Sequence, residues 1–118
     1  MDAQESPDGG VLFFKKGNGL WRRPLRGGMP AGPESQVLDS VDKYNFQIEP
    51  DGIYFIAPPV AGTHAICYYD FASRGIRTIA TTSRRATYGF SVSPDRRAIL
   101  YAQFDESVSD LMLIENFR

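Results

Sequence analysis

A four-residue phrase that occurs three times decides the fold: Ser-Pro-Asp-Gly at residues 6–9, Glu-Pro-Asp-Gly at 49–52 and Ser-Pro-Asp-Arg at 93–96. The three prolines follow one another at intervals of 43 and 44 residues. A period of about 40 to 50 residues is typical of one four-stranded propeller blade. The sequence therefore predicts stacked repeats, whose side chains serve mainly to pack each repeat against its neighbours.

Each phrase predicts a turn between two strands. Proline presets the φ angle of the first central residue, aspartate can hydrogen-bond the backbone that follows it, and glycine tolerates positive φ. The third phrase carries Arg96 in place of glycine, which predicts a looser turn or one in the αR region. Turn formation accounts for Asp8, Asp51 and Asp95, and metal binding is the alternative interpretation of these residues.

An apolar run follows each phrase and predicts a strand that is buried on both faces between neighbouring repeats. The runs are Val-Leu-Phe-Phe at 11–14, Ile-Tyr-Phe-Ile at 53–56 and Ala-Ile-Leu-Tyr at 98–101. If the prolines are equivalent, Phe13, Phe55 and Leu100 occupy related core positions. None of the runs is long enough for a helix.

Further strands are predicted around these runs from alternating apolar residues and flanking turn residues. They are 19–25 and 36–41 in the first repeat, 44–48, 64–71 and 75–80 in the second, and 88–92 and 110–117 in the third. Segments 44–48 and 88–92 match position by position and predict the innermost strand of a blade. The equivalent residues 1–5 are mostly polar, so that strand is expected to be weak.

The phrase, the apolar strand and the segment Gly-Leu-Trp-Arg-Arg-Pro-Leu-Arg-Gly-Gly at 19–28 together resemble the WD-like, PD-type propeller repeat of TolB-type proteins. Residues 89–118 are similar to the closing blade of propellers at the C-terminus of bacterial winged-helix regulators and membrane-linked kinases. The resemblance implies one all-β domain over 1–118, with about three four-stranded blades at 1–43, 44–86 and 87–118. No winged-helix or kinase motif is present, so neither DNA binding nor phosphoryl transfer is implied.

Three blades are too few for a ring, because natural propellers have about 4 to 8 blades. An open fan leaves strand edges and apolar blade faces exposed to water. The ring is therefore expected to be closed either by association of copies of this chain or by blades of a longer parent chain. The methionine at position 1 favours association, most simply of two copies around a two-fold axis.

Composition excludes several classes of protein. A net charge of −1 gives no electrostatic basis for binding nucleic acid, and no apolar run is long enough to span a membrane. The single cysteine, Cys67, lies in an apolar strand, so we expect a small buried hydrophobe and no internal disulfide. The expected compartment is cytoplasmic for a complete chain and periplasmic for a piece of a membrane-anchored protein.

The sequence contains no recognisable catalytic, cofactor-binding or metal-binding constellation. His64 is the only histidine, and its place at the start of a strand predicts a capping or solvent-exposed role. Trp21 is expected to pack within a blade, or alternatively to stack on a ligand. The basic pairs are expected to be solvated. The residues predicted for an interaction surface are Trp21, Arg22, Arg23, His64, Arg84 and Arg85.

Two functions remain open. The first is a non-catalytic propeller module for protein-protein interaction or ligand sensing, with an unidentified protein or small ligand as partner and no cofactor. The second is a hydrolase or lyase with a site at the mouth of the propeller channel. Substrate turnover that is lost when one polar channel residue is changed would distinguish the enzyme from the binding module.

Overall fold

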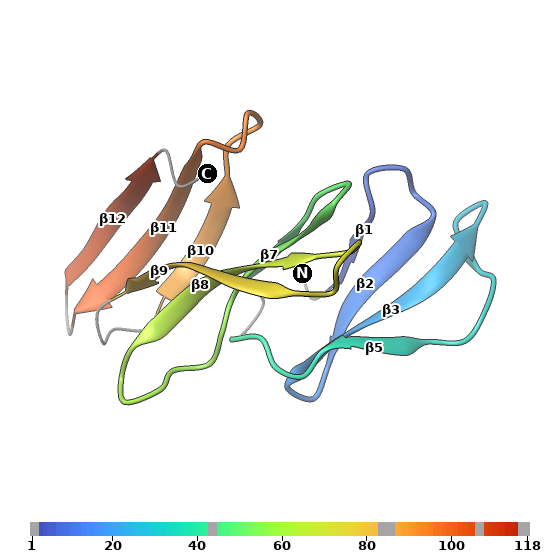
Figure 1. The fold of residues 1–118 in the computed structure, drawn as a ribbon, viewed down its shortest axis with the longest axis horizontal. Helices are drawn as coiled ribbons and strands as arrows, with labels where there is room; N and C mark the ends of the chain where they lie inside the picture. Colours follow the sequence, from blue (N-terminus) through green and yellow to red (C-terminus); the bar gives the residue numbers. More distant parts are fainter. Residues whose placement is uncertain (1–2, 43–44, 83–86, 106–107, 116–118) are drawn as a thin grey trace.

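The computed structural model describes residues 3–42, 45–82, 87–105 and 108–115. These residues form strands and turns, and no helix occurs among them. The strands assemble into three antiparallel sheets, as Figure 1 shows. The predicted all-β class is confirmed. Within the described residues, no helix has the length and apolar character needed to cross a membrane.

The first sheet, called blade 1 below, contains five strands: β1 (Ala3–Glu5), β2 (Val11–Lys16), β3 (Gly19–Arg26), β4 (Met29–Pro30) and β5 (Ser35–Leu38). β1, β2 and β3 form a meander, and both β4 and β5 pair with β3. The polar β1 is short but is paired over all three of its residues. β4 was not predicted from the sequence.

Blade 2 is a four-stranded meander, and blade 3 has three described strands. Blade 2 contains β6 (Phe46–Ile48), β7 (Gly52–Ile56), β8 (His64–Asp70) and β9 (Ile76–Thr82), and blade 3 contains β10 (Thr87–Val92), β11 (Ala98–Asp105) and β12 (Val108–Glu115). These strands overlap the predicted ones. Tyr44 and Phe117, at the ends of two predicted strands, lie outside the described residues.

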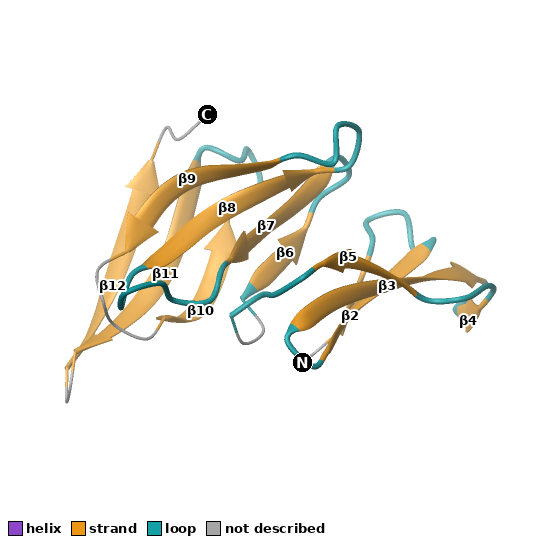
Figure 2. Cartoon of the chain, turned by 60° about the horizontal axis from the view of Figure 1, so that its bottom comes forward, coloured by secondary structure: helices purple, strands orange, loops and turns teal. Residues whose placement is uncertain are grey.

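The three blades lie side by side in chain order with blade 2 in the middle, as Figures 1 and 2 show. Two apolar clusters hold them together. One joins blades 1 and 2 and includes Phe13, Phe46 and Phe55. The other joins blades 2 and 3 and includes Tyr54 and Ile99. Cys67 lies in the first cluster, which confirms the prediction of a small buried hydrophobe.

Strand register shows which residues of the three blades are equivalent. In each blade, the residue three positions before the turn proline pairs with a residue of the next strand. The pairs are Gln4 with Phe13 of β2, Gln47 with Tyr54 of β7, and Ser91 with Leu100 of β11. The partners are therefore nine, seven and nine residues apart. The middle hairpin is two residues shorter than the others, so the predicted equivalence of Phe55 with Phe13 is wrong and Tyr54 takes its place.

The outer two turns share one conformation. Gly9 and Arg96 both have positive φ, at 74° and 62°, and both donate their backbone N–H to the serine carbonyl that begins the turn. The prediction of a looser or an αR turn at Arg96 is wrong, because this residue keeps the hydrogen bond and the left-handed conformation of the glycine that it replaces. The middle turn needs no such residue, since the Glu49 N–H bonds directly to the Gly52 carbonyl.

Burial depends on whether another blade covers the strand. Phe13 and Tyr54 are 2% and 1% exposed, whereas the equivalent Leu100 is 39% exposed. β7 is buried along its whole length, but β2 and β11 each contain residues that are not. The prediction that all three strands are buried on both faces is therefore wrong for β2 and β11. Each of these strands belongs to an end blade, which has a described neighbour on only one side.

Two glutamines connect the innermost strands of neighbouring blades. The Gln4 amide donates to the Phe46 carbonyl at 2.7 Å and its oxygen accepts from the Ile48 N–H at 3.4 Å. The Gln47 oxygen accepts from the Val92 N–H at 3.0 Å and its amide faces the Val92 carbonyl at 3.4 Å. The two side chains occupy equivalent positions, so each bridge joins one blade to the next.

Replacing Gln47 with alanine is expected to lower the free energy of unfolding by about 1 to 2 kcal/mol, because the Val92 N–H loses its partner. Gln36→Ala is the matched control, since the Gln36 amide bonds to Leu38 only two residues away. Urea denaturation of the two variants measures the difference. Equal midpoints would show that the bridge contributes nothing.

Candidate functional site

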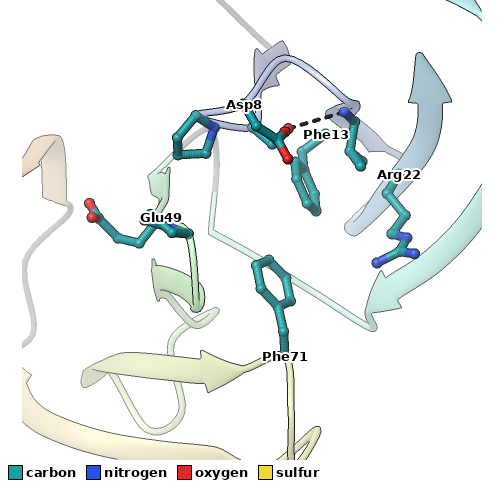
Figure 3. A pocket seen from close by; sticks show the side chains of 9 residues that line it. Asp8, Phe13, Arg22, Glu49 and Phe71 are labelled. Carbon is teal, nitrogen blue, oxygen red and sulfur yellow. Dashed lines mark hydrogen bonds between the residues drawn. The ribbon is translucent and has the colours of Figure 1, made fainter. Parts of the chain in front are cut away.

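A pocket of about 550 Å³ opens between blades 1 and 2, beside their two turns. Blade 1 contributes the turn residues and one face of β2 and β3, and blade 2 contributes its turn and the residue that follows β8. Figure 3 shows these side chains from close by. The lining residues are Ser6, Pro7, Asp8, Val11, Phe13, Arg22, Glu49, Pro50 and Phe71.

Two aromatic rings form the apolar wall of this pocket. Phe13 from β2 and Phe71 from blade 2 point toward one another in Figure 3. Their ring centroids are 5.9 Å apart with an angle of 19° between the planes, which is a stacked arrangement. Phe13 is held in the core between the blades, whereas Phe71 is half-buried. The aromatic wall is therefore part of the packed contact between blades 1 and 2.

Charged groups of both signs border the rings. Hydrogen bonds from the Ser6 hydroxyl and the Gly10 N–H hold the pKa of Asp8 below its usual value, so Asp8 is a carboxylate at neutral pH. Arg22 is exposed and forms no ion pair with any residue in the described part of the chain. The Glu49 carboxylate is turned away from the rings and accepts a hydrogen bond from the Gln47 amide.

Arg22 also borders a second, more polar hollow of about 360 Å³. Blade 1 contributes β5 residues 35–37 to this hollow, and blade 2 contributes Tyr69 and Arg74. Arg74 has a positive φ of 61° in the turn after β8, and its side chain is exposed. The two hollows share one arginine, so Arg22 lies at the centre of the open surface between blades 1 and 2.

The equivalent space between blades 2 and 3 is filled by Arg96. Its guanidinium lies 2.8 Å from the Asp51 carboxylate and donates to the Tyr54 hydroxyl at 3.2 Å. It also lies over the rings of Tyr54 and Tyr68, at 5.4 and 5.7 Å from their centroids. The expectation that the basic pairs are solvated is therefore wrong for Arg96, although Arg97 is exposed.

The guanidinium sets the ionisation of its partners. Burial opposes ionisation of Asp51, but hydrogen bonds from Arg96 and Tyr68 hold the pKa of Asp51 below its usual value. Burial and the hydrogen bond to Asp51 raise the pKa of Tyr68 to about 12, while Arg96 opposes that rise. The interface is thus built from a carboxylate, a cation and a neutral phenol.

The raised pKa of Tyr68 predicts a loss of stability in alkali. A phenol whose pKa is higher in the folded state than in the unfolded state contributes stability that is present below about pH 10 and is lost as the pH rises toward 12. Thermal melts of the wild type and Tyr68→Phe between these pH values measure the effect. The variant is expected to lose less stability than the wild type, and parallel losses would contradict the assignment.

The structure separates the other residues predicted for an interaction surface. Arg22 faces blade 2, whereas Trp21 and Arg23 alternate with it and face the other way. Trp21 is half-buried beneath Lys16, whose ammonium lies 4.8 Å from the ring centroid. Arg23 donates from Nε to the Gly32 carbonyl at 3.0 Å. Arg84 and Arg85 lie outside the described residues.

His64 is buried, so of the two predicted roles, capping or solvent-exposed, the solvent-exposed one is wrong. Its side chain is 4% exposed and lies 3.6 Å from the Asp42 carboxylate and 3.3 Å from the Ala57 carbonyl. His64 therefore contacts the loop that carries Asp42 and the residue that follows β7. In the described residues, no group of three or more His, Cys, Asp or Glu side chains is arranged to hold a metal ion.

Sequence reasoning missed the pocket and the bridging glutamines. The pocket results from a difference in hairpin length, which strand register shows and the turn phrases conceal. The glutamines had a visible signal, because Gln4 and Gln47 both lie three residues before a turn proline. Among the predicted interaction residues that the structure describes, only Arg22 borders the pocket.

Comparison with known proteins supports the fold alone. No family model matches the sequence, and no curated protein sequence matches it at a significant level. The structure is similar to the crystal structure of TolB from Acinetobacter baumannii, with a TM-score of 0.70 and 14% sequence identity. The match covers 98% of this chain and 29% of the TolB chain. The chain therefore has the fold of a partial β-propeller of the TolB type.

Proposed function

We propose that this chain is part of a non-catalytic propeller module that binds a partner through the pocket between blades 1 and 2. The main support for this proposal is the pocket, because it combines an aromatic wall with charged groups where two loops meet. Loops on a rigid β scaffold are a common place for binding sites. The likeness to TolB supports a propeller, and the repeated turn phrases support a WD-like repeat of the PD type.

A library of short peptide amides, screened by two-dimensional NMR on the isotope-labelled protein, tests this function. Peptides that bind are expected to shift the signals of residues that line the pocket. Val11→Phe should block them by filling the pocket, whereas Leu25→Phe, at a half-buried position in β3 outside the lining, should not. Binding that maps to other residues, or that survives Val11→Phe, would overturn the proposal.

We also propose that a second copy of this chain covers the outer face of blade 3 and completes a ring. Leu100 and Leu113 lie opposite one another in β11 and β12 and are 39% and 56% exposed. They occupy the row that faces the following blade in blades 1 and 2. The alternative is that blades of a longer parent chain cover this row.

Replacing Leu113 with glutamate is expected to convert the assembly to a monomer of 13.2 kDa, since it places a charge in the apolar contact. Ile76→Glu is the matched control, because Ile76 is 59% exposed but lies at the outer edge of blade 2. Light scattering measures the mass of each. A wild-type protein that is already monomeric would contradict self-association and leave the longer parent chain as the source of the missing blades.

A further inference from the structure

We propose that the pocket between blades 1 and 2 is a receptor for an arginine side chain of a partner protein. The inference rests on the proposed binding function and adds the chemistry of the occupant. Its basis is a comparison within the molecule, since the same position between blades 2 and 3 is occupied by the guanidinium of Arg96. The chain thus contains its own example of a filled site.

Register matches the rings of the two sites, and the turn phrase places an aspartate beside each ring. Asp8 and Asp51 each follow the turn proline of their blade. Phe13 and Tyr54 are equivalent because each lies opposite the glutamine of the innermost strand. In the filled site, the carboxylate and the ring hold the guanidinium by an ion pair and by contact with the ring face.

The first site is open because the middle hairpin is shorter. Arg96 reaches its site from the left-handed position of the third turn. The second turn lacks that position, since Glu49 bonds directly to Gly52 across Pro50 and Asp51. No side chain of this turn can therefore extend over Phe13 as Arg96 extends over Tyr54, and the pocket takes up the space.

The charges of the pocket suit a cation on the Asp8 side. Asp8 is a carboxylate at neutral pH, and the hydrogen bonds from Ser6 and Gly10 lower its pKa further. The stacked rings of Phe13 and Phe71 offer an aromatic surface. Arg22 stands where Tyr68 completes the filled site, and its charge opposes a second cation. The pocket is therefore expected to bind arginine more weakly with Arg22 present than without it.

The experiment titrates the full chain with N-acetyl-arginine amide and follows two-dimensional NMR signals. The neutral isostere N-acetyl-citrulline amide and N-acetyl-lysine amide serve as comparison probes. The arginine probe is expected to shift signals of the lining residues and to bind about tenfold more tightly than the citrulline probe. The lysine probe should fall between them, because an ammonium has no planar face to lie on the rings.

Matched variants test the roles of the walls. Asp8→Asn is expected to weaken arginine binding about tenfold, whereas Asp95→Asn should leave it unchanged. The control is close, since both aspartates accept a serine hydroxyl and a backbone N–H in the same kind of turn, and only Asp8 lines the pocket. Arg22→Tyr, which reproduces the filled site, is expected to strengthen arginine binding.

Each outcome decides one of the proposals. Equal binding of the arginine and citrulline probes, or tighter binding of an acidic peptide that Arg22→Tyr abolishes, would overturn the arginine inference and leave the binding function standing. If none of these probes shifts the signals of the lining residues, the arginine inference is overturned. If, in addition, no peptide of the library binds, the proposed binding function is overturned too. An unchanged thermal melt of Asp8→Asn shows that its effect is on binding and not on folding.

Discussion

Replacing Gly52 with alanine is expected to lower the free energy of unfolding by about 3 kcal/mol or more, and the melting temperature by about 10 °C or more. A Cβ atom at this position would lie 2.2 Å from the Tyr69 carbonyl oxygen and 2.5 Å from the Tyr68 ring. The middle strand would have to move away from its neighbour. Thermal and urea denaturation measure the loss.

Gly75→Ala is the control for this variant. Its added Cβ would meet only the Ser73 hydroxyl at 3.3 Å, and the residue lies on the surface. A small change is therefore expected at Gly75. If Gly52→Ala melted at the temperature of the wild type, strands β7 and β8 could not lie as close as the structure places them.

Phe13→Ala is expected to cost about 3 to 5 kcal/mol of unfolding free energy, because it leaves a cavity at the contact between blades 1 and 2. Leu100→Ala is the matched control at the equivalent position of blade 3. That residue is 39% exposed, so its loss should cost about 1 kcal/mol or less in the monomer at low protein concentration. Urea denaturation of both variants measures the difference.

A cost at Leu100 equal to that at Phe13 would contradict an open outer face on blade 3. A small cost at Phe13 would contradict the packing of blade 1 on blade 2. Either result would also affect the pocket, since Phe13 provides its aromatic wall. The difference in unfolding free energy between Phe13→Ala and Leu100→Ala therefore tests the order of the blades.

The repeated phrases, the apolar runs and the alternating segments were sufficient to predict the described strands other than β4, because these signals are local. They were not sufficient to predict burial. Phe13 and Leu100 occupy one repeat position, but a neighbouring blade covers Phe13 whereas no described blade covers Leu100. Whether a neighbouring blade covers a residue depends on how the blades are arranged, and the sequence of one repeat does not show that arrangement.

The turn phrases were misleading about the middle hairpin. Pro-Asp-Gly is present in both the first and second repeats, yet Gly9 has positive φ and Gly52 does not. Gly52 is needed for close approach to β8 instead, and the hairpin is shorter by two residues. The candidate site follows from this difference, so it could not be found by treating the three phrases as equal.

Blades 1, 2 and 3 pack in chain order, and a glutamine side chain joins each blade to the next. Nuclear Overhauser contacts from the glutamine side-chain amides of the labelled protein test this arrangement most directly. The Gln4 amide protons are expected to lie close to the backbone of Phe46 and Ile48, and those of Gln47 close to Val92. Contacts of either amide with a different strand, or with none of these residues, would contradict the order of the blades and the pocket that depends on it.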